Sequence, residues 1–120
     1  MTSEETRRLA LVHELLELTM PLERVIGELA SMTWDYEGEG VELTQGHLTS
    51  VLQRYLRAEV SEAEVELWAN QVEGRDDVQL DASAETLIEE VLHELANPLL
   101  TQQLDRTRAM ELVSRLTASG

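Results

Sequence analysis

Acidic side chains are the groups in this sequence that could do chemistry, and they gather in two loop-like segments, residues 35–40 and 75–81. Calcium in a helix–loop–helix site takes oxygen ligands from loop positions one, three, five and twelve, with glycine at six. Counted from Asp35, the early oxygen donors and the glycine are present, but position twelve is Gly46. In the second segment, no starting residue places both the oxygen ligands and the glycine at the positions that a calcium loop needs. We therefore expect solvated acidic loops, with a divalent-cation site as an alternative.

The other candidates for chemistry are isolated residues. Glu90 and His93 have the Glu-x-x-His spacing that places two metal ligands on one face of a bundle helix, but the second pair of a di-iron site would have to come from a homodimer. No Gly-x-Ser-x-Gly turn, phosphate-binding glycine loop or Cys is present. We predict no catalytic residue, metal or cofactor. A carboxylate pair such as Glu37 with Asp77, brought together by folding, is the enzymatic alternative.

Net charge is the strongest property of the chain. There are 24 acidic residues against 9 basic ones, all Arg, and the formal net charge is -15 over 120 residues. Such a surface repels nucleic acid and anionic membranes and favours basic proteins or cations. Arg without Lys is typical of a GC-rich bacterial genome. The first residues lack a secretory signal and no apolar run approaches the roughly 18 residues of a membrane span, so we expect a cytoplasmic protein.

Apolar residues recur at helical spacing along most of the chain, which predicts an all-α fold, a compact bundle of about six short helices in a single domain, residues 1–120. Thr44 and Ser61 are suited to N-caps, and Gly74 to a left-handed residue just past a helix end. Residues 1–4 and 118–120 should fray. The expected helices cover about residues 4–19, 21–32, 44–56, 61–73, 83–96 and 104–117.

A weak internal repeat appears when the chain is shifted by 40 residues, because the apolar positions of one helix pair then fall on those of the next. Each unit would consist of a helix, an acidic loop, a Val-x-Leu segment and a second helix. If the repeat is structural, Val41–Leu43 and Val78–Leu80 should form a minimal antiparallel β contact between two helix–loop–helix units. The alternative is a chance agreement between two amphipathic helix pairs.

Two aromatic residues make the first acidic loop the better interface candidate. Trp34 and Tyr36 lie in a segment that offers little to bury them, whereas Trp68 has the helical spacing of a core residue in a chain without Phe. We expect partner contacts from the aromatic and acidic residues of the two loops, namely Trp34, Asp35, Tyr36, Glu37, Glu39, Glu42, Asp76 and Asp77.

These observations favour an acidic protein-binding module, of the kind that acts as a stoichiometric immunity or antitoxin-like inhibitor of a basic protein. Electrostatic steering would speed its association, and a few buried anchors would supply affinity. Neither nucleic acid nor membrane is expected as a partner, and the protein would be a monomer or homodimer. One alternative is a structural, self-associating helical protein with an apolar patch at Leu99, Leu100 and Leu104. The other is the cation-binding protein or carboxylate enzyme considered above.

Overall fold

The computed structural model describes residues 3–32, 38 and 40–118, and this part of the chain forms the predicted bundle of six helices. None of these helices is long and apolar enough to cross a membrane. Two three-residue strands and a 3₁₀ turn complete the fold. In chain order the elements are α1 (Ser3–Glu17), α2 (Leu22–Ala30), β1 (Val41–Leu43), α3 (Gln45–Leu56), α4 (Glu62–Val72), β2 (Val78–Leu80), η1 (Ala82–Ala84), α5 (Glu85–Ala96) and α6 (Arg106–Ala118).

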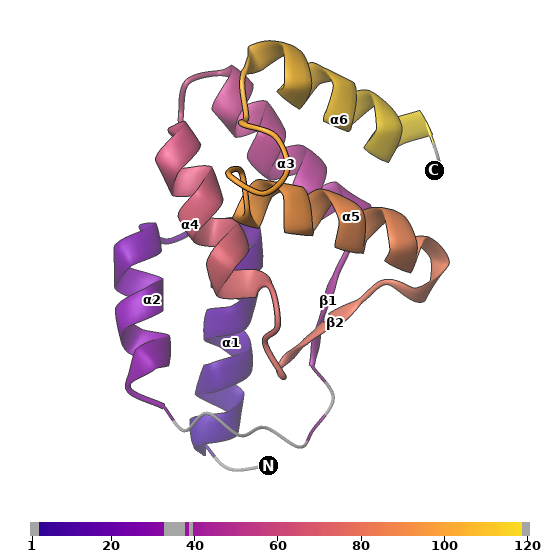
Figure 1. The fold of residues 1–120 in the computed structure, drawn as a ribbon. Helices are drawn as coiled ribbons and strands as arrows, with labels where there is room; N and C mark the ends of the chain where they lie inside the picture. The colour runs from indigo at the N-terminus through magenta and orange to yellow at the C-terminus, as the bar shows by residue number, and fades with distance from the viewer. Residues whose placement is uncertain (1–2, 33–37, 39, 119–120) are drawn as a thin grey trace.

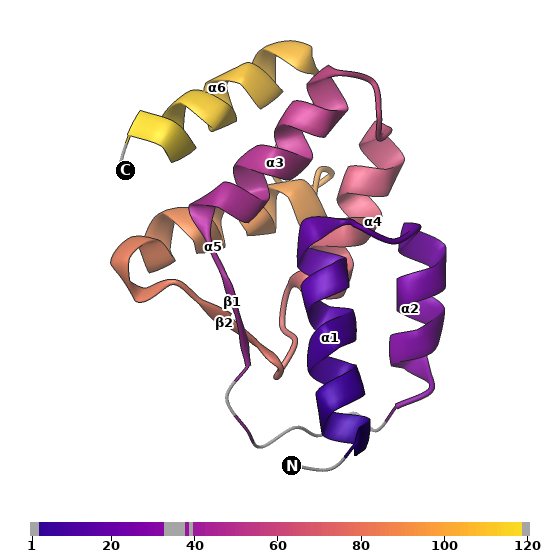
Figure 2. The same ribbon diagram turned by 180° about the vertical axis from the view of Figure 1, so that it is seen from behind.

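The helices pack from one end of an elongated molecule to the other. Helices α1 and α2 lie side by side near the N-terminus, and α6 lies at the opposite end, with α3, α4 and α5 between them (Figures 1 and 2). The closest helix pairs are α3 with α6 and α4 with α5. Helix α6 is therefore attached mainly through α3.

The two strands pair at the segments that the internal repeat predicts, but they run parallel rather than antiparallel. Val41 is opposite Val78, and Leu43 is opposite Leu80. In the structure, α3 leads away from β1 and α4 returns, so that β2 begins at the same end of the sheet (Figures 1 and 2). Parallel strands require a long connection of this type.

Both predicted N-caps are confirmed. The Ser61 hydroxyl accepts a hydrogen bond from the Glu64 amide at 3.1 Å, and the Glu64 carboxylate accepts one from the Ser61 amide at 3.0 Å. At α3 a histidine replaces the glutamate, because the Thr44 amide donates to His47 Nδ1 at 3.0 Å. Burial lowers the pKa of His47 below its ordinary value, which favours the neutral ring that this acceptor role needs.

Trp68 lies in the centre of the core, as its spacing in the sequence predicts. It is the largest fully buried side chain, and its Nε1 donates to the Leu15 carbonyl at 2.7 Å. That carbonyl belongs to the last turn of α1, where backbone acceptors run out of helical donors. One side chain thus fills the core and also adds a donor at the end of α1, where the Leu15 carbonyl accepts the Leu18 amide as well, at 3.3 Å.

Helix α3 ends in a left-handed residue that is not glycine. Ala58 has φ 61°, and its amide donates to Tyr55 O at 3.0 Å, while the Glu59 amide donates to Arg54 O at 2.8 Å. These two bonds form a Schellman motif. An L-residue in this conformation costs roughly 1–2 kcal/mol. We expect Ala58→Gly to raise the free energy of unfolding by about 0.5 kcal/mol, because the relief exceeds the added chain entropy of glycine.

Gly74 provides the matched control for this prediction. It follows α4 with φ 80°, and no atom lies within 4 Å of the place that a Cβ would occupy. Gly74→Ala therefore adds backbone strain without a clash, and should lower the free energy of unfolding by about 1 kcal/mol. Urea denaturation followed by circular dichroism measures both changes. A loss of stability in Ala58→Gly would show that its left-handed backbone is not strained.

Candidate partner-binding site

Asp77, one of the eight predicted partner contacts, is fully buried. Its Oδ2 accepts hydrogen bonds from Arg8 Nε at 2.8 Å and from Arg75 Nη2 at 3.0 Å, and its Oδ1 accepts one from Arg75 Nε at 2.7 Å. Burial raises the pKa of Asp77, but the hydrogen bonds and positive charges of both arginines outweigh it and hold the pKa below its ordinary value. Asp77 is therefore a structural residue that ties α1 to the loop before β2, rather than an exposed contact.

The structure places Gly40, at the end of the first acidic segment, against the second segment where the strands begin. Gly40 lies against the backbone of Asp77, so closely that a Cβ would come within 2.6 Å of the Asp77 carbonyl. Glu42 is exposed on β1, and Asp76 is exposed just before β2. These two predicted contacts remain accessible near the same strand pair. The other five, Trp34, Asp35, Tyr36, Glu37 and Glu39, lie outside the described residues.

A cavity of about 280 Å³ adjoins the Asp77 ion pairs. Ile26 and Leu29 of α2 contribute apolar lining, and Asn70 of α4 and Arg75 contribute polar lining. Cofactor and drug-sized ligands occupy pockets of roughly 300–1,000 Å³. At about 280 Å³ this cavity lies just below that range, so it has room for a small molecule or for a side chain of a partner.

The described residues contain no group of three His, Asp or Glu side chains that could hold a metal ion. The Glu-x-x-His pair of α5 is divided between two contacts. Glu90 Oε2 accepts a hydrogen bond from Arg115 Nη2 at 3.0 Å, and His93 Nδ1 lies 3.2 Å from Glu73 Oε2. Glu90 therefore connects α5 to α6, and His93 connects α5 to the residue that follows α4.

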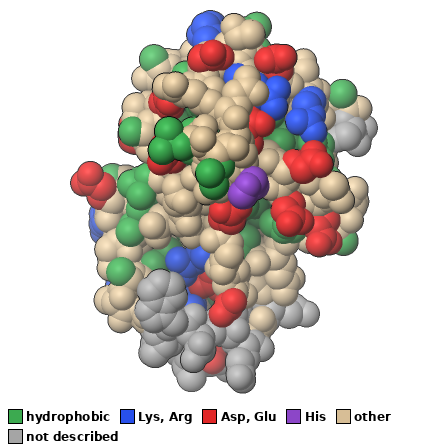
Figure 3. All heavy atoms as spheres, in the orientation of Figure 1, with side chains coloured by type: hydrophobic (Ala, Val, Ile, Leu, Met, Phe, Trp, Pro, Cys, Tyr) green, Lys and Arg blue, Asp and Glu red, His purple; other side chains and the backbone are tan. Residues whose placement is uncertain are grey.

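Internal ion pairs use most of the positive charge. In the described part of the chain, seven of the nine arginines lie within ion-pair distance of a carboxylate, as Arg7–Glu28, Arg8–Asp77, Arg54–Glu59, Arg57–Glu59, Arg75–Asp77, Arg108–Glu94 and Arg115–Glu90. Figure 3 shows basic and acidic side chains next to one another on one face, together with acidic side chains that have no basic neighbour there.

Many carboxylates have no such partner. Eight exposed or half-exposed acidic side chains form neither an ion pair nor a side-chain hydrogen bond with any described residue, namely Glu17, Glu23, Glu42, Glu62, Glu66, Asp76, Glu85 and Glu89. The negative charge of the chain is therefore left mainly at the surface.

Among the residues that the structure describes, the most exposed large apolar side chains lie in the turn between α5 and α6. Leu99 is 100% exposed and Leu100 is 81% exposed. Leu104, the third member of the apolar patch predicted from the sequence, is instead buried, because the chain returns to the core before α6 begins and places Leu104 beside Leu95. The exposed apolar surface of this turn thus consists of two adjacent leucines.

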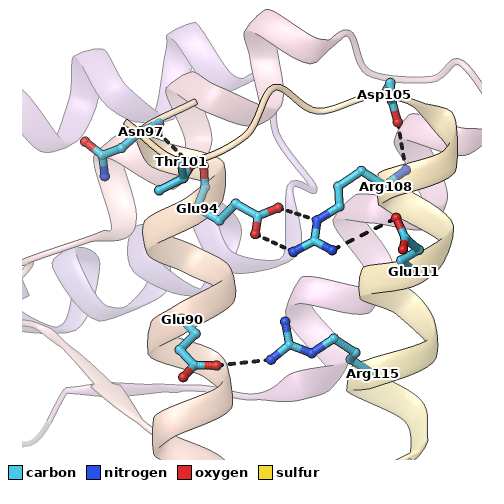
Figure 4. Close-up of polar contacts among 8 residues, drawn as sticks. All are labelled: Glu90, Glu94, Asn97, Thr101, Asp105, Arg108, Glu111 and Arg115. Carbon is cyan, nitrogen blue, oxygen red and sulfur yellow. Dashed lines mark hydrogen bonds and ion pairs between the residues drawn. The ribbon is translucent and has the colours of Figure 1, made fainter. Parts of the chain in front are cut away.

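Hydrogen bonds hold this turn on the end of α5. The amides of Leu100 and Thr101 donate to Asn97 O at 3.1 and 3.0 Å. The Thr101 hydroxyl donates to Glu94 O at 3.1 Å and to Asn97 O at 2.8 Å, and Asn97 Nδ2 donates to His93 O at 2.9 Å. Figure 4 shows Asn97 and Thr101 close to Glu94. The Asn97-Pro98 pair is a turn signal, and Pro98 closes the fifth predicted helix.

The side chain of Glu94 also joins α5 to α6. Both of its oxygens accept hydrogen bonds from Arg108, from Nε at 2.8 Å and from Nη2 at 2.6 Å (Figure 4). The hydrogen bond that Arg108 donates to the Glu94 carboxylate raises the pKa of Arg108. Asp105 Oδ1 accepts a bond from the Arg108 amide at 2.7 Å and so caps α6. One residue, Glu94, therefore supports the turn through its carbonyl and α6 through its carboxylate.

No family model, curated protein or solved structure matches this chain. A functional proposal must therefore come from the charge distribution and the contacts described above.

Proposed function

We propose that this protein is a binding module for a basic partner protein, acting as a stoichiometric inhibitor of the immunity or antitoxin kind. One observation carries the proposal: seven of the nine arginines are held in internal ion pairs, while eight carboxylates have neither an ion pair nor a side-chain hydrogen bond within the described residues. A surface divided in this way presents uncompensated negative charge to solvent. It attracts a basic protein over about one Debye length, roughly 8 Å at physiological salt, and accelerates association.

Carboxylates projecting from a helical scaffold suit the occupation of a basic cleft. Glu62 and Glu66 are one turn apart on α4, and Glu85 and Glu89 are one turn apart on α5. Residues at this spacing share a helix face, so each pair presents two negative charges in one direction. A cleft that binds phosphate groups would offer the complementary positive charges.

Self-association is the second candidate function, and the exposed leucines of the α5–α6 turn are the observation that favours it. Each copy would bring a formal charge of -15 to the contact. Charge repulsion between identical surfaces opposes this association, particularly at low salt. The two candidates therefore have opposite salt dependences.

Affinity capture of the tagged protein from its native host tests the proposal. At about 50 mM salt we expect one basic protein in near-stoichiometric amount, and at about 500 mM salt much less of it, as measured by quantitative mass spectrometry. A variant with Glu62→Gln, Glu66→Gln and Glu89→Gln removes three unpaired charges and should capture less.

The matched control removes one charge of each sign. Glu90→Gln combined with Arg115→Gln leaves the net charge unchanged and should capture as much partner as the wild type, because both residues already neutralise each other. Capture of the chain's own copies alone would favour self-association. A partner whose recovery is the same at both salt concentrations would contradict the proposal.

A further inference from the structure

We infer that the turn between α5 and α6 is the apolar anchor of this partner contact, and that Leu99 and Leu100 insert into an apolar groove bordered by Lys or Arg side chains on a basic protein. The inference rests on the proposed function and identifies the surface that performs it.

The exposure of the two leucines is the first observation. The other apolar residues with large exposed side chains in the described chain, Leu67 and Met110, are 39% and 55% exposed, whereas Leu99 is completely exposed. Burying one leucine side chain is worth roughly a 10- to 100-fold gain in affinity. Two adjacent leucines therefore provide an anchor of the size found at the centre of specific interfaces.

The rigidity of the turn is the second observation. Thr101 and Asn97 make hydrogen bonds to the backbone at the end of α5 at distances of 2.8–3.1 Å, and Asn97 Nδ2 also lies 3.4 Å from Oε1 of Glu73, the residue that follows α4. These bonds fix the backbone on both sides of the leucines. A preorganised turn loses little conformational entropy on binding, so more of the free energy of apolar burial is retained as affinity.

Charge around the turn selects the partner. Glu62 and Glu66 of α4 line a shallow hollow together with Pro98 and Gln102, the residues that flank the leucine turn, and neither carboxylate has an ion pair among the described residues. On the α6 side, the charge of Arg108 is matched by Glu94. Figure 3 shows apolar side chains near the middle of this face with acidic side chains around them.

The carboxylates of Glu62 and Glu66 decide between the two possible partners of the turn, a second copy of the chain and a basic protein. A second copy of the chain would bring its own Glu62 and Glu66 toward the same carboxylates, and like charges at an interface oppose association. A groove with a basic rim would pair with these carboxylates while it covered the leucines. Charge complementarity therefore points to a basic protein.

Site-specific photo-crosslinking in the native host provides the first test. The full chain carries a photo-reactive residue in place of Leu100, or in place of Ser114 on the exposed face of α6 as a control. We expect position 100 to crosslink to the same basic protein that is captured at low salt, and position 114 not to do so. Crosslinking of position 100 to another copy of the chain would overturn the inference.

Affinity measurements with that purified basic protein provide the second test. Leu99→Ser with Leu100→Ser should weaken binding by about 100-fold, whereas Met110→Ser, a control at an exposed apolar residue of α6, should stay within about twofold. Thr101→Val removes the hydroxyl donor that is shared between the Glu94 and Asn97 carbonyls and should weaken binding by about tenfold, and Thr101→Ser should restore it. Thermal unfolding of each variant checks that the fold is intact.

The outcomes separate the anchor from the proposed function. If the double leucine variant binds the basic partner as tightly as the wild type, the anchor lies elsewhere while the proposed function stands. If sedimentation shows a dimer that the double variant abolishes, a second copy occupies the turn and the inference is overturned. If no basic protein is captured at either salt concentration, the inference and the proposed function both fail.

Discussion

Trp68→Ala is expected to lower the free energy of unfolding by about 4 kcal/mol, which is a large part of the total stability of a domain of this size. The indole is fully buried between α1 and the middle of the bundle, so its removal leaves a cavity. The substitution also leaves the Leu15 carbonyl without the donor that now lies 2.7 Å away. Urea denaturation followed by far-ultraviolet circular dichroism measures the loss.

Trp68→Phe separates the two contributions. The phenyl ring keeps much of the packing but has no N–H group, so the Leu15 carbonyl loses the hydrogen bond from the indole and keeps that from the Leu18 amide at 3.3 Å. We expect a loss of about 2 kcal/mol, between the wild type and the alanine variant. If Trp68→Ala is within about 1 kcal/mol of the wild type, Trp68 does not hold the core together.

Asp77→Asn is the second large effect, with an expected loss of about 3 kcal/mol at pH 7. The side chains of Arg8 and Arg75 are only 7% and 19% exposed, and the single carboxylate of Asp77 is hydrogen-bonded to both. Asparagine is similar in shape but carries no charge. The variant therefore leaves two largely buried guanidinium groups without this counter-ion, and α1 loses its tie to the loop before β2.

The pH dependence of this loss follows from the lowered pKa of Asp77. A carboxyl group whose pKa is lower in the folded state than in the unfolded state stabilises the fold above its unfolded pKa, which is about 3.9. That contribution disappears as the pH falls through the folded pKa. The difference between the wild type and Asp77→Asn should therefore be constant from pH 7 to 5 and shrink below pH 4.

Urea denaturation of both proteins at pH 7, 5, 4 and 3 measures this difference. His47 is present in both proteins, so its own titration cancels in the comparison. Asp76→Asn is the matched control, because Asp76 is exposed and has no ion pair in the described chain, and it should change stability by less than about 0.5 kcal/mol. An equal effect of the two substitutions would show that the buried ion pairs contribute nothing.

Local sequence signals predicted the elements of the fold well. Thr44 and Ser61 cap the helices that follow them, and Gly74 has the left-handed backbone expected beyond α4. The internal repeat located Val41–Leu43 and Val78–Leu80 as partners, but their orientation depends on the path of α3 and α4. A pattern of apolar residues does not record that path.

The site was harder to predict because its contacts join distant parts of the chain. Arg8 and Asp77 are 69 residues apart, and nothing near Asp77 distinguishes it from Asp76, which is exposed. Leu99 and Leu104 are equally apolar, yet one is exposed and the other buried. Which leucine faces solvent depends on the hydrogen bonds that Glu94 makes to the α5–α6 turn and to α6. These contacts are a property of the tertiary structure.

The dissociation constant of the purified protein with its captured partner, measured across salt concentrations, is the most direct test of the account. If uncompensated surface carboxylates draw in a basic protein, affinity should fall by on the order of tenfold or more between about 50 and 500 mM salt, mainly through slower association. An affinity and association rate that do not change with salt would contradict the central claim, and would assign binding to apolar contacts alone.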